Sequence, residues 1–205
     1  MNRFLFWSLL LLLSWSCTKQ TTTLVDTWSD TDYPAQGIDK FLVVGTSPNR
    51  LVRKTFEVAM RDRLNRQSGI EAMASLEAIS AEEEISTATF EQYFKDSGID
   101  AVLVTRVVDA KEAAKFKKGD KHQQLNPYYN DFFSYYRRMI VKVPEPGTFN
   151  YGKMVQLETN VFETEEGKLI WRALSQSYDE GNTEKVIDDL TKLILKQMKE
   201  DGVIR

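Results

Sequence analysis

The chain has 205 residues, with 27 lysines and arginines against 30 aspartates and glutamates, and its formal net charge is −3. This balance excludes a global attraction to nucleic acid. One cysteine and one histidine are present, which excludes an internal disulfide, CxxC redox chemistry, cysteine-rich zinc sites and iron–sulfur clusters.

The beginning of the chain has the layout of a cleavable export signal. Arg3 supplies a positive start, Phe4–Leu13 is apolar with one exception, and Ser14–Ser16 brings small residues up to Cys17. About ten apolar residues are too few to cross a hydrocarbon core, which needs roughly 20. We therefore expect Met1–Ser16 to be a signal peptide that is removed on export.

This stretch resembles a bacterial lipoprotein signal, in which Cys17 becomes the lipidated first residue of the mature chain. The alternative is an ordinary secreted protein that carries Cys17 as a free thiol. Lipidation removes a thiol that has no partner in an oxidising compartment, and more than one acyl chain gives a stable membrane anchor. Cys17 is followed by Thr18 rather than by an aspartate, which in lipoproteins of this type resembles the outer-membrane sorting signal. The resemblance implies an outer-membrane lipoprotein of the cell envelope that faces the periplasm.

Thr18–Ile38 is polar and rich in threonine, and it has no hydrophobic period. It predicts a spacer between residue 17 and the folded domain. Within it, Trp28 and Tyr33 are expected to cover an edge of the core rather than to stack on a ligand. A mature chain that starts at Cys17 has 189 residues, enough for one domain of ordinary size, which we place at residues 39–205. Because Arg3 is lost with the signal, the formal charge of the mature chain is −4.

The first half of this domain alternates strands and helices. Phe41–Gly45 predicts a strand buried on both faces, and a helix follows, capped by Ser47 and ended by Gly69. Ile70–Leu76 is predicted as a strand that returns to the sheet. A short helix that starts at Ser86 or Thr87 and ends at Gly98 then leads to a buried strand at Ala101–Val104, extended by Val107 and Val108. Two βα steps that feed a third strand predict a parallel sheet.

The second half begins with a Lys/Tyr-rich insert at about 110–152, which has no committed period. Met154–Phe162 alternates, and with Leu169–Ala173 it predicts a hairpin whose Gln156, Glu158 and Asn160 share a solvated face. Trp171 should lie on the covered face, against Leu190 and Ile194 of a last helix that ends at Gly202. We expect this helix to cover the second face of the sheet. The fold class is therefore α/β, in two or three layers, with a mixed sheet: a parallel βαβαβ part, then an antiparallel hairpin and a C-terminal helix.

The whole pattern resembles uncharacterised bacterial envelope lipoproteins. The similarity is carried by Gly45-Thr46-Ser47 after the first strand, by Ser97-Gly98-Ile99-Asp100 before the buried strand, by the tyrosine-rich insert, and by Gly167-Lys168-Leu169-Ile170-Trp171 in the hairpin. More distantly, the chain is similar to α/β lipoprotein domains of the curli secretion subunit, of activators of peptidoglycan synthases and of the amino-terminal domain of the Tol translocation protein. The resemblance implies a fold and carries over no catalytic residue.

Six aromatic residues crowd into nine positions of the insert and are followed by two arginines: Tyr128, Tyr129, Phe132, Phe133, Tyr135, Tyr136, Arg137 and Arg138. A helix would bury the stripe formed by residues 128, 132, 135 and 136, whereas tyrosines beside arginines are typical of interface anchors. Tyr129 and Phe133 form a second ridge about 100° around the helix. The insert is therefore predicted as the contact surface for a partner.

A second candidate site is the start of the first helix, where Ser47, Arg50, Arg53 and Lys54 could bind an anion. The competing interpretation is a cap at Ser47 and a solvated basic face. His122 stands in a charged segment and is expected to be a solvated loop residue. No GxSxG, HExxH or Walker motif occurs.

These features predict a non-catalytic, membrane-tethered module for protein interaction or assembly, with an envelope protein as partner and with no cofactor or metal. The alternative is a periplasmic protein that binds a small ligand or a cell-wall polymer, and a hydrolase comes third.

Overall fold

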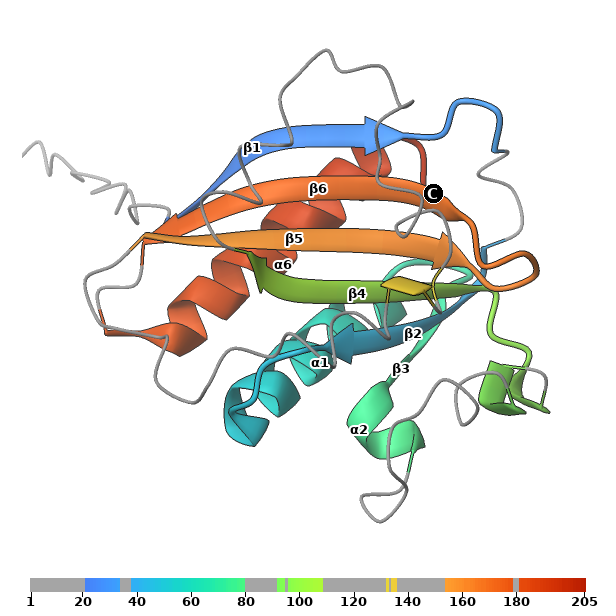
Figure 1. The fold of residues 1–205 in the computed structure, drawn as a ribbon, viewed down its shortest axis with the longest axis horizontal. Coiled ribbons are helices and arrows are strands. Elements are labelled where there is room, and N and C mark those ends of the chain that lie inside the picture. Colours follow the sequence, from blue (N-terminus) through green and yellow to red (C-terminus); the bar gives the residue numbers. More distant parts are fainter. Residues whose placement is uncertain are drawn as a thin grey trace, which may run out of the picture.

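The structure is a computed structural model that describes residues 21–33, 38–79, 92–94, 96–108, 132, 134–135, 154–178 and 181–205. Its strands are β1 (Thr22–Ser29), β2 (Lys40–Gly45), β3 (Glu71–Ala74), β4 (Ala101–Val108), β5 (Met154–Glu163) and β6 (Leu169–Tyr178). Its labelled helices are α1 (Arg50–Asn65), α2 (Ser75–Ala78) and α6 (Thr183–Glu200). The six strands form one sheet in the order β1-β6-β5-β4-β2-β3 (Figure 1).

The sheet is mixed, as the sequence predicted. β2 pairs in parallel with β3 on one side and with β4 on the other, and α1 makes the crossover from β2 to β3. β5 and β6 form the antiparallel hairpin, and β5 continues the sheet from β4. The short apolar run of β2 is buried along both faces, with Phe41, Leu42 and Val43 fully buried.

One face of the sheet is covered by both long helices. Phe56, Met60 and Leu64 of α1 belong to the same core cluster as Leu190, Ile194 and Met198 of α6. The two helices contact each other directly, and Arg63 of α1 bonds to Asp188 and Thr191 of α6. The prediction that α6 covers the second face is therefore wrong, because its apolar stripe shares one core with α1. Trp171 is fully buried in that core, as predicted, and its Nε1 donates to Asp201 (2.8 Å).

The opposite face has a second core. Leu42, Val44, Val102 and Val104 meet Phe162 there, and the covering residues Ile79, Phe94, Phe132 and Tyr135 complete the same cluster. Phe132 packs against Phe94 and Phe162 with ring centroids 5.5 and 5.8 Å apart. The hairpin face that the sequence predicted to be solvated lies on this side, where Glu158 and Asn160 are buried.

Three local expectations need correction. The predicted spacer contains β1, which pairs antiparallel with β6 at the edge of the sheet, so the folded domain starts before residue 39. The cap of α1 is Asn49, whose side chain accepts from the backbone of Leu51 and Val52. β3 ends at Ala74, because the next four residues form α2. Trp28 and Tyr33 pack against the two cores as partly buried side chains, as expected.

Candidate functional site

The polar centre of the second face is a buried cluster around Glu158 of β5. The carboxylate accepts from Arg106 of β4 and from Arg172 of β6, and the Tyr135 hydroxyl donates to it at 3.2 Å. The Glu158 side chain is fully buried, and those of the arginines are 11% and 9% exposed. Three adjacent strands therefore meet at one carboxylate.

The electrostatics of this cluster keep Glu158 ionised. Burial opposes the charged form, but the positive charges of Arg172 and Arg106 outweigh burial and lower the pKa of Glu158. Burial raises the pKa of the Tyr135 hydroxyl well above its usual value, and the charge of Glu158 acts in the same direction. The hydroxyl therefore stays protonated and able to donate. The arrangement fixes Tyr135 to the sheet through hydrogen bonds that are assisted by charge.

A second buried carboxylate, Glu57 of α1, organises the end of β2. It accepts from the backbone of Gly45 (2.9 Å) and Leu76 (2.8 Å), from Ser75 Oγ (2.8 Å) and from Arg53 Nε (2.8 Å). A Cβ on Gly45 would lie only 3.2 Å from the Phe56 ring, so glycine lets α1 approach β2 closely. These bonds hold β2, α1 and α2 together.

Two of the four residues predicted to bind an anion are bonded within the fold. Arg53 bonds to Glu57 and Ser75, and Ser47 Oγ accepts from the backbone of Asn49 at 3.2 Å. Arg50 and Lys54 are exposed on the first turn of α1. The structure therefore gives two of the four residues roles within the fold.

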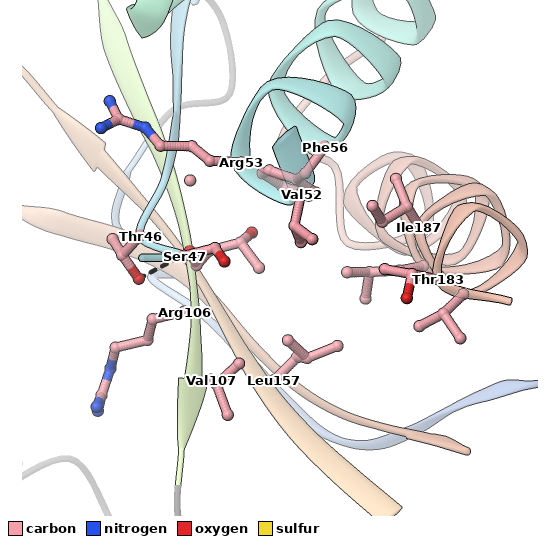
Figure 2. Close-up of a pocket in the computed structure, with 14 residues that line it drawn as sticks. Thr46, Ser47, Val52, Arg53, Phe56, Arg106, Val107, Leu157, Thr183 and Ile187 are labelled. Carbon is pink, nitrogen blue, oxygen red and sulfur yellow. Dashed lines mark hydrogen bonds between the residues drawn. The ribbon is translucent and has the colours of Figure 1, made fainter. Parts of the chain in front are cut away.

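A pocket that the sequence reasoning missed lies between the first turns of α1 and α6 (Figure 2). Val52 and Phe56 face it from α1, Ile187 faces it from α6, and Val107 and Leu157 form its floor on the sheet. Thr46, Ser47, Arg53, Arg106 and Thr183 are among the other residues that line it. Its volume is about 60 Å³. Its walls come from separate elements, so no single sequence window reveals it.

Thr21, just before β1, is hydrogen-bonded to Asp189 of α6, and we call this pair of residues the clamp. Asp189 Oδ2 accepts from Thr21 N (2.9 Å), from Thr21 Oγ1 (2.8 Å) and from Lys185 Nζ (2.6 Å). Burial opposes ionisation of Asp189, but the bonds from Lys185 and Thr21 prevail and lower its pKa. Beside the clamp, Thr22 and Ser177 bond through their hydroxyls at 2.8 Å. Thr21 is four positions after Cys17.

We call the end of the sheet that holds this clamp the tether end, because Thr21 closely follows Cys17, the expected site of the lipid anchor. At this end of the sheet, the first residues of β1 and β5 lie beside the last residues of β6 and β4. The last residues of β2 pair with β4 at the same end. The first turns of α1 and α6 follow β2 and β6, so they begin at the same end, on the left of Figure 1.

Two aromatic residues of the predicted contact surface are buried instead. Phe132 and Tyr135 are each 1% exposed, so these two cannot contact a partner from the surface. The other six residues of that prediction lie outside the described part of the chain, as do Cys17 and His122. The described residues contain no group of three or more His, Cys, Asp or Glu side chains that could hold a metal ion. None of the described helices has the length and apolar character that crossing a membrane requires.

No protein-family model and no curated protein matches this chain. Among solved structures, it is similar to a PelC dodecamer from Paraburkholderia phytofirmans, with 11% sequence identity and a TM-score of 0.48 over 90% of this chain and 99% of that chain. It is similar also to a point variant of that PelC, again a dodecamer, with 10% identity and a TM-score of 0.47 over 85% of this chain and 95% of that chain.

Proposed function

We propose that this protein is an envelope lipoprotein, tethered to the outer membrane through Cys17, that works as a non-catalytic module for protein interaction or assembly. Its partner would be another envelope protein, met through the aromatic insert. The tether rests on the sequence resemblance to a lipoprotein signal. The role of the insert rests on one structural observation, the attachment of Phe132 and Tyr135 to the sheet.

That attachment explains how an insert could present a defined surface. Phe132 and Tyr135 have helical backbone and lie together in the second core, where Tyr135 packs on Phe162 at 5.1 Å between ring centroids and bonds to Glu158. On a helix, residues one position further along are rotated by about 100°. Burial of one stripe would then leave other aromatic residues of the insert for a partner, as aromatic anchors in interfaces are.

The chemistry of the described residues is consistent with this role. The two carboxylates Glu57 and Glu158 both have their oxygens engaged in bonds that join strands and helices. The pocket of about 60 Å³ is far smaller than the roughly 300–1,000 Å³ typical of small-molecule sites. This pocket by itself therefore gives no support to the small-ligand alternative.

Cross-linking in cells that produce the full-length chain tests the proposal. The wild type should recover a stoichiometric envelope protein, and replacing Tyr129, Phe133 and Tyr136 by serine should abolish that recovery. The thermal midpoint of the triple variant should stay close to that of the wild type, because the two buried rings are untouched.

Lys192 and Lys196 provide the matched control, since both are exposed on α6. Their replacement by serine should leave recovery of the partner intact. A large fall in the thermal midpoint of the triple variant would instead place its aromatic residues in the core and overturn the assignment of the insert.

A further inference from the structure

The four exposed large apolar side chains of the described residues are unevenly distributed. Leu51, on the first turn of α1, is 73% exposed, Met154, at the start of β5, is 60% exposed, and Tyr178, at the end of β6, is 43% exposed. All three lie at the tether end, and only Val25 lies elsewhere, along the edge strand β1. The apolar pocket between α1 and α6 is at this end too. Apolar side chains gathered at one end of a domain indicate a surface that meets another apolar phase.

The length of chain before Thr21 limits where that phase can be. Thr21 is four positions after Cys17, and a fully extended chain covers at most about 3.6 Å per residue, so the clamp lies within about 14 Å of Cys17. The β5–β6 hairpin turn lies at the opposite end of the sheet. It is farther from Cys17 than the clamp is by the length of β5, whose 10 residues extend for about 34 Å. An acylated Cys17 would therefore hold the tether end, and not the hairpin, next to the bilayer.

We propose that the tether end is a membrane-contact surface, on which Leu51, Met154 and Tyr178 insert into the headgroup region of the bilayer that holds the acyl chains. This inference rests on the proposed lipid anchor. The described charges at this end are mixed, with Arg50 and Lys54 on α1 and Glu184 on α6. Apolar contact, rather than attraction to anionic lipid, therefore sets the orientation. The sheet then stands with its β5–β6 hairpin pointing away from the membrane.

Position-specific fluorescence on the full lipidated chain tests the orientation. Cys17 is the sole cysteine and its thiol is acylated, so one introduced cysteine gives a single labelling site. Leu51→Cys and Tyr178→Cys probe the tether end, whereas Glu165→Cys in the hairpin and Lys196→Cys late in α6 are controls at exposed positions of the opposite end. The labelled proteins are reconstituted into vesicles of phosphatidylethanolamine and phosphatidylglycerol that carry a nitroxide-labelled lipid.

We expect the nitroxide lipid to quench the labels at residues 51 and 178 strongly, while those at residues 165 and 196 keep their emission and are quenched by aqueous iodide. Added salt should leave this pattern unchanged. Equal access of iodide to all four labels would overturn the inference. So would cross-links between copies through residue 51 without quenching by lipid, since a second copy would then cover this end.

Mass measurement of the same preparations separates this inference from the proposal on which it rests. A chain without acyl groups on Cys17 overturns the lipid anchor and the membrane contact together. An acylated chain whose labels at residues 51 and 178 stay aqueous overturns the membrane contact alone.

Discussion

At the scale of single residues, buried carboxylates decide how the sheet is held together. Glu158 looks in the sequence like the polar position of an alternating strand, yet its side chain is fully buried between two arginines and a tyrosine. A buried charge is tolerated when it is paired and hydrogen-bonded, and removing one partner of such a pair leaves the others without compensation.

We expect Glu158→Gln to lower the free energy of unfolding by about 3–5 kcal/mol, because two guanidinium groups lose the carboxylate that they share. Urea unfolding at neutral pH measures this change. Glu165→Gln, at an exposed hairpin position, is the control and should unfold at the urea midpoint of the wild type. An unchanged midpoint for Glu158→Gln would show that the cluster contributes nothing to stability.

The same residue gives the wild type a pH dependence. The pKa of Glu158 is lowered from its ordinary value of 4.5, so below that value the unfolded chain binds the proton more readily than the folded chain. The stabilisation from ionised Glu158 is therefore complete above about pH 4.5 and is lost as the pH falls through the folded pKa. Urea unfolding repeated at a series of pH values measures this loss of stability, which Glu158→Gln should not show.

At the scale of elements, the hairpin and α6 depend on each other through Trp171. Its indole is fully buried beneath α6, and Nε1 donates to Asp201 just after the helix. The edge strand β1 depends on α6 too, through the bonds from Thr21 to Asp189. α6 therefore serves as the common support of β6 and β1.

Replacing Trp171 by alanine should cost about 3–5 kcal/mol of stability, since a large cavity opens between the sheet and α6. Chemical denaturation followed by circular dichroism measures this loss. Trp171→Phe, which keeps an aromatic ring but loses the bond to Asp201, should cost clearly less. If the alanine variant unfolded at the denaturant concentration of the wild type, the indole would not be part of the core.

At the scale of the whole molecule, the fold and the proposed anchor are separable. The described domain begins at Thr21 and closes its cores with residues from 22 onward, so no described contact needs Cys17. Cys17→Ala should therefore leave the thermal midpoint of the domain unchanged while the protein leaves the membrane fraction, because the proposed acyl chains would supply the strong attachment.

Metabolic labelling with a fatty acid, followed by cell fractionation, checks this expectation. Wild-type protein should take up label and sediment with membranes, and the alanine variant should do neither. Wild-type protein that takes up no label would contradict the anchor.

The sequence by itself determined the elements whose signal is local. The apolar run of β2 and the periodic stripes of α1 and α6 predict those elements, because burial on two faces or along one stripe is written in neighbouring residues. The mixed sheet followed from the order of these elements, and the covered position of Trp171 followed from the alternation of β6. The expected export signal is a local pattern too, and it stays a prediction.

Only the tertiary structure decided the rest. β1 is polar and threonine-rich, and it is a strand because β6, some 150 residues away, supplies its hydrogen-bond partners. α6 shares a face with α1 because the two stripes fill one core, a choice that neither stripe encodes alone. Glu158 is buried because the register of three strands brings Arg106 and Arg172 to it, and because Tyr135 arrives from a distant segment. Such placements depend on partners far along the chain, which local periodicity cannot identify.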